Sequence, residues 1–304
     1  MMKHELSVLI PVYEDDCREQ VSSICRQLAD SSLERYEVIV ADDGSKDRNY
    51  VELCSEVSTL PYVRFIAREE NSGRACIRNF LAKEAKYEWL LFIDAELMPK
   101  DDQFIKRYIE SEGRDVVCGD YEVGTCDNPS NLRYRYETAI ASQHATDRRR
   151  AKPFHHFHTA NFLIARRLML AYPFDERFRD YGYEDVLFGK RLSQAGASIE
   201  HIDNPVIFCH FDTNERFVSK TEESLRTLHE FRNDLRGYSR MLTFVDGIHL
   251  ESVRWVIRLW HFAFGRLERR LLCGRLSRLS IFKAYKLGFF LSLKQNSPST
   301  DNKK

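Results

Sequence analysis

Short apolar runs alternate with amphipathic segments through the first hundred residues, and this alternation restricts the possible folds more than any other feature. Strands are expected at residues 6–12, 37–41, 62–67 and 89–94. Helices are expected between them, at residues 16–29, 47–58 and 73–85. The run WLLFID at residues 89–94 is apolar almost throughout, which is typical of a central strand covered on both faces. Alternating units of this length predict an open α/β sheet with right-handed crossovers.

The middle of the chain is less regular. Strands are expected at residues 116–121 and 159–165, with two short ones between 200 and 210. Helices are expected at residues 131–143, 184–195 and 221–237. The basic run at residues 148–152 is predicted to be an exposed loop.

The charge of the chain is balanced overall but unevenly distributed. Lys plus Arg and Asp plus Glu both number 46, so no global excess indicates nucleic-acid binding. Residues 245–304, however, hold 12 Lys and Arg against 4 Asp and Glu. We therefore expect a catalytic domain at residues 1–244 and a basic tail at residues 245–304.

The tail mixes arginine and lysine with Trp, Phe and Leu at helical spacing, as in SVRWVIRLWHFAFG and IFKAYKLGFFLSL. This composition is typical of amphipathic helices that lie on an anionic membrane surface. The alternative is a helical lid packed on the catalytic body or on a second subunit. The last residues, 294–304, are expected to be disordered.

The cysteines and the N-terminus indicate the compartment. None of the eight cysteines forms a C-x-x-C pair, and Cys76 and Cys118 have apolar neighbours, as buried free thiols do. The opening residues turn acidic after a short apolar stretch, so no signal peptide is expected. No run is long and apolar enough to span a bilayer. These observations predict a cytoplasmic protein, peripheral on the inner face of the cell membrane.

Acidic residues follow three of the predicted strands, at Glu14, Asp15 and Asp16, at Asp42 and Asp43, and at Asp94 and Glu96. In open α/β sheets, ligands bind outside the carboxyl ends of the strands. Any single aspartate here would be explained by turn formation. Three acidic strand ends that converge on one crevice favour a cation site or hydrogen bonding to a base or ribose.

Five blocks occur in an order that resembles a known family. They are SVLIPVYEDD, VIVADDGSKD, ENSGRACIRNFLA, WLLFIDAELMP and RDYGYEDVLFGKRL. Together they resemble the inverting nucleotide-sugar glycosyltransferases of family 2, of the bacterial polysaccharide and lipopolysaccharide type, over about residues 6–238. The resemblance implies the GT-A fold, a Rossmann-like mixed sheet flanked by helices.

The resemblance also implies a donor site. The positions that match its nucleotide-sugar contacts are Pro11, Tyr13, Glu14, Asp42, Asp43, Asn71, Gly73, Arg74, Arg78 and Asp94. Among them, a carboxylate at Asp43 can accept a uracil N–H or ribose hydroxyls. Arg74 and Arg78 are four residues apart on one helical face and suit an anionic phosphate, unless that face is simply solvated.

A divalent cation, Mn²⁺ or Mg²⁺, is implied by the same resemblance. Asp94 and Glu96 occupy the place of the D-x-D motif, and His210 matches a histidine that completes the metal shell. Glu96 departs from the usual Asp and adds one methylene, so its carboxylate must fold back or bind through water. Imidazole with carboxylates suits Mn²⁺ better than Mg²⁺.

The acidic pair Glu184 and Asp185 matches the family's catalytic position. Inversion by direct displacement needs a base that takes the proton of the acceptor hydroxyl, and a positioned carboxylate does this. The resemblance gives that role to Asp185 and places Glu184 nearer the acceptor. Without the resemblance, the pair would be explained as acids that stabilise a helix N-terminus.

The cluster His155, His156 and His158 has the spacing H-H-x-H. It could ligate a metal, but no carboxylate of matching spacing accompanies it, so contact with the acceptor is the favoured interpretation.

These features predict a metal-dependent inverting glycosyltransferase of the hexosyltransferase type. It would move a sugar from a nucleoside-diphosphate donor, expected to be a UDP-sugar, to a hydroxyl of a glycan or lipid-linked acceptor in cell-surface polysaccharide synthesis. A second copy of the chain is a further candidate partner, and nucleic acid is not expected. The alternatives are a catalytically silent nucleotide- or glycan-binding scaffold and, less favoured, a nucleotidyltransferase.

Overall fold

The computed structural model describes residues 3–294, so nearly all of the predicted disordered end lies outside the described residues. The chain divides into two compact units. The first comprises residues 1–126, 137–179 and 184–210, and the second comprises residues 127–136, 180–183 and 211–304. The predicted boundary between a domain at 1–244 and a tail at 245–304 stays a prediction.

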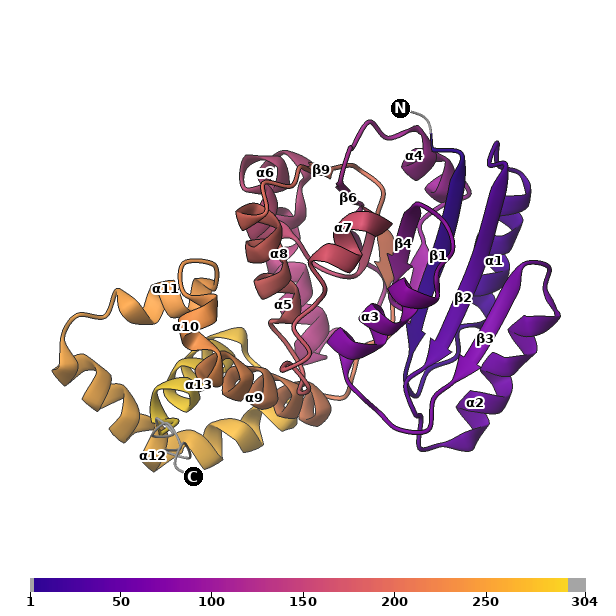
Figure 1. Ribbon diagram of the computed structural model, residues 1–304. Helices are drawn as coiled ribbons and strands as arrows, with labels where there is room; N and C mark the ends of the chain where they lie inside the picture. The colour runs from indigo at the N-terminus through magenta and orange to yellow at the C-terminus, as the bar shows by residue number, and fades with distance from the viewer. Residues whose placement is uncertain (1–2, 295–304) are drawn as a thin grey trace, which may run out of the picture. The chain divides into compact units, whose positions relative to one another are not determined.

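A seven-stranded sheet forms the centre of the first unit (Figure 1). Its strand order is β3-β2-β1-β4-β8-β6-β9. The strands are β1 (Glu5–Val12), β2 (Arg35–Asp42), β3 (Val63–Ala67), β4 (Trp89–Ile93), β6 (Val116–Cys118), β8 (Asn161–Ala165) and β9 (Ile199–His201). β1 runs parallel to both β2 and β4, whereas β8 runs antiparallel to both β4 and β6. The predicted mixed α/β sheet is therefore confirmed.

Helices follow the strands as the alternation predicts. They are α1 (Arg18–Ala29), α2 (Arg48–Ser55), η1 (Glu56–Thr59), α3 (Arg74–Glu84), α4 (Phe104–Glu110), α7 (Arg166–Ala171) and α8 (Glu184–Gln194). One face of the sheet, with Leu9, Ile39 and Phe92, shares a core with residues of α3, α7 and α8. Helix α1 contacts β2 and α4. Strand β1 is buried along most of its length because its side chains on both faces are covered.

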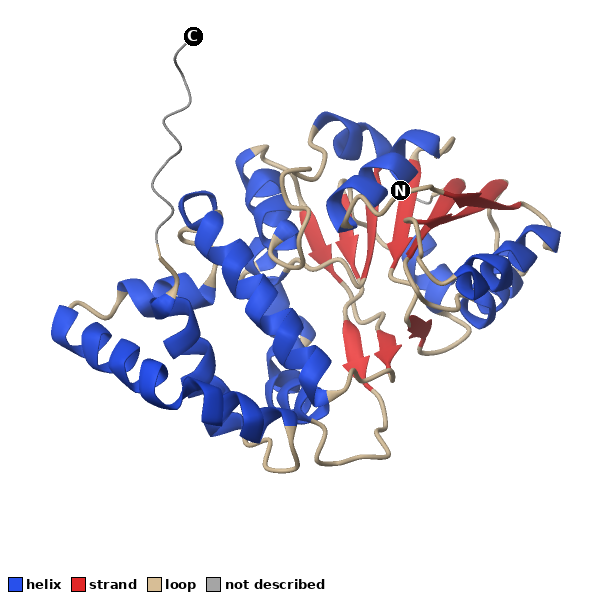
Figure 2. Ribbon diagram, turned by 90° about the horizontal axis from the view of Figure 1, so that it is seen from below, coloured by secondary structure: helices blue, strands red, loops and turns tan. Residues whose placement is uncertain are grey.

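A smaller sheet joins three segments that are far apart in the sequence (Figure 2). It consists of β5 (Leu97–Pro99), β7 (Tyr121–Val123) and β10 (Val206–Phe208), with β10 in the centre. β10 pairs antiparallel with β5 and parallel with β7. The strand expected at residues 116–121 is thus two strands, β6 and β7, which belong to different sheets.

The basic run at residues 148–152 is mostly exposed, as predicted, but it is helical, so the prediction of a loop was wrong. Helix α6 (Thr146–Ala151) covers most of it, between the short helices η2 (Ala141–His144) and η3 (Pro153–His156). Arg149 is buried and donates to the carbonyls of His144 and Ile202. The other residues of the run are exposed, so the stretch is a solvated helix that one inward-facing arginine attaches to the fold through backbone acceptors.

The second unit is helical. It contains α9 (Asn214–Glu230), α10 (Arg232–Leu235), α11 (Arg240–Asp246), α12 (Glu251–Cys273) and α13 (Leu279–Ser292), and it includes the start of α5 (Leu132–Ile140). Its core holds Leu132, Val218, Leu272, Phe282 and Tyr285. Residues of the predicted tail therefore share a core with α9.

A buried polar contact joins the same helices. Glu222 of α9 accepts hydrogen bonds from the hydroxyl of Tyr285 at 2.6 Å and from Nε of Arg269 at 2.8 Å. The outer surface of α12 is different, because most of its large apolar side chains are exposed to solvent. They are Val253, Trp255, Val256, Leu259, Trp260, Phe262, Phe264 and Leu267. Throughout residues 3–294, no helix has the length and apolar character needed to cross a bilayer.

Candidate active site

The loops after β1 and β2 are tied together by buried polar contacts. Asp42 accepts hydrogen bonds from the backbone N–H and the hydroxyl of Ser45. The hydroxyl oxygen of Ser45 in turn accepts from the backbone N–H of Glu14 at 2.8 Å. Glu14 has a positive φ of 51°, an uncommon conformation for a residue other than glycine. Tyr13 beside it stays partly exposed, and Pro11 pairs with Ala41 within the sheet.

Asp43 is almost completely buried, and four donors surround its carboxylate. Oδ1 accepts from Arg68 at 2.7 Å and from the hydroxyl of Ser72 at 2.8 Å. Oδ2 accepts from the backbone N–H groups of Ser72 and Gly73, at 3.1 and 2.9 Å. These contacts join the end of β2 to the start of α3. Contact of Asp43 with a base or ribose stays a prediction.

Gly73 is the turn into α3, with a φ of 90° that favours glycine. A Cβ on this residue would lie 2.7 Å from the carbonyl oxygen of Arg179, so a side chain has no room there. Asn71 and Arg74 on either side are exposed. They are therefore accessible to a ligand, as the resemblance implies.

Arg78 is not on a solvated helix face. Its side chain is 1% exposed, and its Nη2 lies 2.6 Å from Oδ1 of Asp94. Its Nη1 lies 3.6 Å from Oε1 of Glu184 and donates to the carbonyl of Arg74 at 3.2 Å. The guanidinium thus connects the carboxylate at the end of β4 to the acidic pair that opens α8.

Asp185 is the titratable group whose pKa shift is most suited to catalysis. Burial, reinforced by the negative charge of Glu184, raises the pKa of Asp185 to about 6. The charges of His158 and Arg78 act in the opposite direction and favour the ionised form. Oδ1 of Asp185 accepts from the backbone N–H of Val186 at 2.7 Å, which fixes the side chain at the helix start. A carboxylate with a pKa near 6 can take a proton from an acceptor hydroxyl at neutral pH.

The three predicted metal ligands are only partly brought together. Burial raises the pKa of Asp15, the charge of Glu96 raises it further, and His210 opposes the shift, so Glu96 and His210 each lie within electrostatic reach of Asp15. Asp94 uses Oδ1 for Arg78. Within the described residues, Asp94, Glu96 and His210 do not form a group with ligand atoms inside 4.8 Å of one another. Asp15 was expected among the acidic residues after the first strand, but it was not assigned to the donor or metal site.

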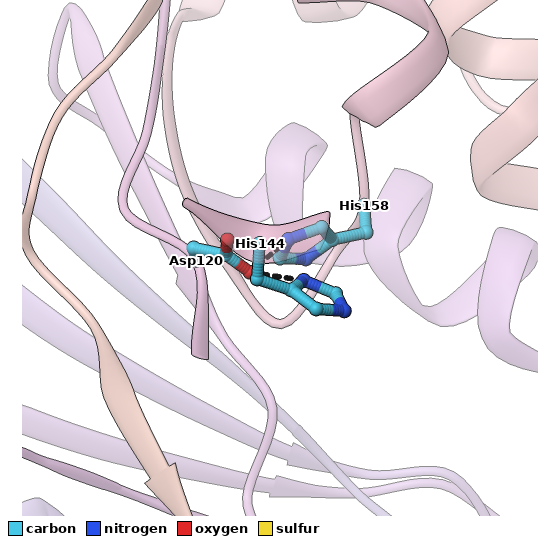
Figure 3. Close-up of side chains that lie close together, drawn as sticks. All are labelled: Asp120, His144 and His158. Atoms are coloured by element: carbon cyan, nitrogen blue, oxygen red, sulfur yellow. Dashed lines mark hydrogen bonds and ion pairs between the residues drawn. The ribbon is translucent and has the colours of Figure 1, made fainter. Parts of the chain in front are cut away.

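A cluster that meets this distance lies elsewhere. The ligand-type atoms of Asp120, His144 and His158 all lie within 4.8 Å of one another, and Figure 3 shows both imidazole rings against the carboxylate. Of the H-H-x-H histidines, only His158 belongs to this cluster. Asp120 and His144 were missed because they come from two other segments, and nothing in the sequence indicates that these segments lie close to His158.

His158 of this cluster lies near the acidic pair Glu184 and Asp185. Helix α8 approaches the segment before His158 closely, since a Cβ on Gly189 would lie 2.7 Å from the carbonyl oxygen of Phe154. The ring of Phe157 packs 5.4 Å from that of Phe188. Gly189 is one helical turn after Asp185 on the same face, so this face of α8 is directed at the segment that carries His158.

Comparison with known proteins agrees with this architecture. The family model described as Glycosyl transferase family 2 matches residues 7–171. Among curated proteins, the chain is 25% identical over 245 residues to chondroitin synthase of Escherichia coli, covering 67% of this chain and 34% of that protein. The chain thus spans about a third of the length of that relative.

Two solved structures share the fold. The mannosyltransferase PcManGT from Pyrobaculum calidifontis, in complex with GDP-Man and Mn²⁺, has a TM-score of 0.55 at 13% identity, covering 96% of this chain and 85% of that one. S. aureus TarS has a TM-score of 0.51 at 18% identity, covering 93% and 90%. Because the family model covers more than half of the chain, and the mixed sheet and the acidic strand ends agree with it, this protein belongs to glycosyl transferase family 2.

Proposed function

We propose that the protein transfers a sugar, with inversion, from a nucleoside-diphosphate donor to a hydroxyl of a glycan or lipid-linked acceptor in cell-surface polysaccharide synthesis. The carrying observation is the line of contacts Asp94–Arg78–Glu184 next to Asp185. It joins the strand end expected to face the donor diphosphate to the carboxylate suited to act as base.

In the proposed reaction, Asp185 is ionised and accepts a hydrogen bond from the acceptor hydroxyl. The hydroxyl oxygen attacks the anomeric carbon from the face opposite the diphosphate and forms the new C–O bond. The bond to the diphosphate oxygen breaks, the nucleoside diphosphate leaves with that electron pair, and the hydroxyl proton moves to Asp185. A raised pKa makes the carboxylate a stronger base than an ordinary aspartate.

Glu184 and Arg78 hold this carboxylate in place. Glu184 is 5% exposed, so its charge is felt strongly by its neighbour and keeps the pKa of Asp185 high after burial has raised it. Arg78 limits that effect, since a buried acidic pair without a cation would not ionise at neutral pH. We therefore assign Arg78 as a positioning residue rather than a phosphate ligand.

A divalent cation, Mn²⁺ or Mg²⁺, is proposed for the donor site, with Asp94, Glu96 and His210 as its side-chain ligands. Two carboxylates and one imidazole are a suitable donor set for Mn²⁺. The chain does not assemble them to ligand distance by itself, so the donor diphosphate is expected to complete the site. When bound, the cation would neutralise charge on the leaving diphosphate. PcManGT, which has the same fold, was solved with GDP-Man and Mn²⁺.

The tail is proposed to hold the protein at the cytoplasmic face of the membrane. Exposed apolar side chains of α12 stand beside exposed basic residues of the same region. The exposed basic residues are Arg258, Arg266, Arg270, Arg275, Arg278 and Lys283. Aromatic and basic side chains on one exposed helix are suited to an anionic interface. This address would suit a lipid-linked acceptor.

Donor hydrolysis across a panel of UDP-, GDP- and dTDP-sugars with Mn²⁺ tests the proposal. We expect one donor to be cleaved well above the others and the product sugar to have the inverted anomeric configuration. Binding of a nucleotide sugar without cleavage in any acceptor mixture would instead support a silent scaffold. Release of pyrophosphate from a sugar phosphate and a nucleoside triphosphate would support a nucleotidyltransferase.

A further inference from the structure

We infer that Asp120, His144 and His158 form a binding site for a divalent transition-metal ion, made of different side chains from the proposed donor-site ligands. The inference does not depend on the glycosyltransferase reaction. It rests on the placement of three ligand atoms and on the groups that orient them.

The two histidine rings converge on one carboxylate oxygen of Asp120 (Figure 3). Oδ1 of Asp120 lies 3.1 Å from Nδ1 of His144 and 2.6 Å from Nε2 of His158. Two imidazoles and one carboxylate are a common donor set for Zn²⁺, Fe²⁺ and related ions, whereas Mg²⁺ and Ca²⁺ prefer oxygen alone. Three protein ligands also leave coordination positions open for water or substrate.

The ring nitrogens of His158 are held in position but lack well-directed hydrogen bonds. Both nitrogens of its ring are shielded from solvent, and within the described residues neither has a hydrogen-bond partner of good geometry. The 2.6 Å approach to Asp120 is therefore a close ion contact rather than a well-directed hydrogen bond. A metal ion bound between Nε2 and the carboxylate would replace this close contact with two coordination bonds.

The carboxylate is held in a way that leaves one oxygen for a cation. Nε of Arg149 lies 2.8 Å from Oδ2 of Asp120, which is the oxygen away from the two histidines. Arg149 is itself fixed, because it contacts Nδ1 of His201 at 2.9 Å and donates to the carbonyl of Ile202. An arginine on the second oxygen restricts Asp120 to binding a metal through Oδ1 alone.

The backbone around Asp120 is equally constrained. Asp120 has a φ of 75°, which is strained for a residue other than glycine. At Gly119, a Cβ would lie 2.1 Å from Oδ1 of Asn161, and the side chain of Asn161 donates to the carbonyl of Asp120. The packing thus forces an uncommon conformation that directs the carboxylate toward the histidines. Strain of this kind is concentrated at functional sites.

His144 has the outer partners that metal-bound histidines usually have. Its Nδ1 faces Asp120, and its Nε2 lies 3.4 Å from the hydroxyl of Tyr121. That hydroxyl donates to Glu137 at 2.9 Å. A chain from imidazole through a hydroxyl to a carboxylate fixes the ring and increases its basicity. Loss of such outer partners typically weakens metal affinity about 10- to 100-fold.

Cobalt binding to the purified, metal-stripped full chain tests the inference without any sugar substrate. Co²⁺ titrated into the wild-type protein should give visible d–d absorption that saturates near one ion per chain, and Zn²⁺ should displace it. Since none of the eight cysteines forms a disulfide, thiolate binding must be distinguished from the inferred site. A cobalt site made of nitrogen and oxygen ligands lacks the intense near-ultraviolet band of a thiolate.

The variants separate this site from its surroundings. His144→Ala and His158→Ala should each weaken Co²⁺ binding at least tenfold, and Tyr121→Phe should weaken it less. His155→Ala, in the same histidine run, should bind as wild type does. If an alanine variant fails to fold, His144→Gln and His158→Gln serve in its place, and the Zn²⁺-induced rise in wild-type melting temperature supplies a second measurement.

No saturable Co²⁺ or Zn²⁺ binding by the wild-type chain would overturn the inference and leave an ion-paired Asp–His network. Binding that survives in both histidine variants, or that carries the thiolate band, would overturn it as well.

Discussion

Nη2 of Arg78 lies 2.6 Å from Oδ1 of Asp94, in a contact where the arginine is almost fully buried and the aspartate is 15% exposed. Helix α3 and the end of β4 are thereby joined by a charge pair in addition to the apolar core that they share. Because Arg78 also approaches Glu184, its removal would leave two carboxylates in a shielded environment without their cation.

Arg78→Met should therefore destabilise the protein by about 3–5 kcal/mol, the usual effect of removing one partner of a buried ion pair. Urea denaturation measures this loss. Arg74→Met is the matched control, since Arg74 lies one turn away on an exposed position and should change stability little while weakening donor binding. Equal stability losses in the two variants would contradict the buried role of Arg78.

Asp185→Asn should reduce the rate of sugar transfer about 10²- to 10⁴-fold, because an amide cannot accept the hydroxyl proton. Donor affinity should stay within about threefold of wild type. Single-turnover kinetics and calorimetric titration of the donor measure the two quantities separately. A variant that keeps half of the wild-type rate when chemistry is limiting would remove Asp185 from the base role.

The pH dependence of kcat/KM should have an acid limb near pH 6. Burial and Glu184 raise the pKa of Asp185 to about 6, and the base works only as the carboxylate. Lowering the pH through this value protonates it, so kcat/KM should fall tenfold per unit below about pH 6 and level off above it. Glu184→Gln removes the neighbouring charge and should move the limb to lower pH. An unchanged limb in Glu184→Gln would mean that another group titrates.

Chelation should abolish sugar transfer, and Mn²⁺ should restore it more effectively than Mg²⁺. Asp94→Ala should weaken metal-dependent donor binding. Glu96→Asp should preserve or improve metal affinity if glutamate ligates with difficulty, because aspartate is one methylene shorter. Wild-type rates in excess chelator would refute a metal role for Asp94, Glu96 and His210.

The strand pattern of the first unit could be predicted because it depends on local composition. Apolar runs such as VLIPV are buried on both faces, and the expected and observed strands agree within one or two residues. The run at 148–152 could not be predicted, since the helix depends on Arg149 reaching carbonyl groups in other segments. The division of residues 116–121 between two sheets likewise depends on pairing with β10.

The site could be predicted only as residue identities. The acidic strand ends and the pair at 184–185 were visible, but the direction of each side chain was not. Arg78 was expected to face phosphate, but it faces Asp94 and Glu184. The contact with Glu184 could not be predicted, because α8 lies more than a hundred residues further along the sequence. The cluster of Asp120, His144 and His158 was beyond prediction for the same reason.

The membrane proposal is best tested on the exposed face of α12. Trp255 is 60% exposed and Phe262 is 88% exposed, so replacing both with serine should leave the fold intact. Deletion after Asp246 is a poor test, since it would remove Leu272 and Phe282 from the core shared with Val218. We expect the double serine variant to lose most of its sedimentation with anionic vesicles, because it removes apolar area that would enter the acyl boundary.

Charge provides the second half of this prediction. Each basic residue near an anionic surface contributes about 1 kcal/mol, so replacing Arg266 and Arg270 with glutamine should weaken vesicle binding about 30-fold. Raising salt should weaken wild-type binding, and neutral vesicles should bind less than anionic ones. Tyr62→Ser and Tyr172→Ser, at exposed aromatic positions of the first unit, are the controls and should bind as wild type does. If the wild-type protein ignores anionic vesicles, the exposed side chains of α12 do not serve membrane attachment, and a protein partner becomes the explanation for them.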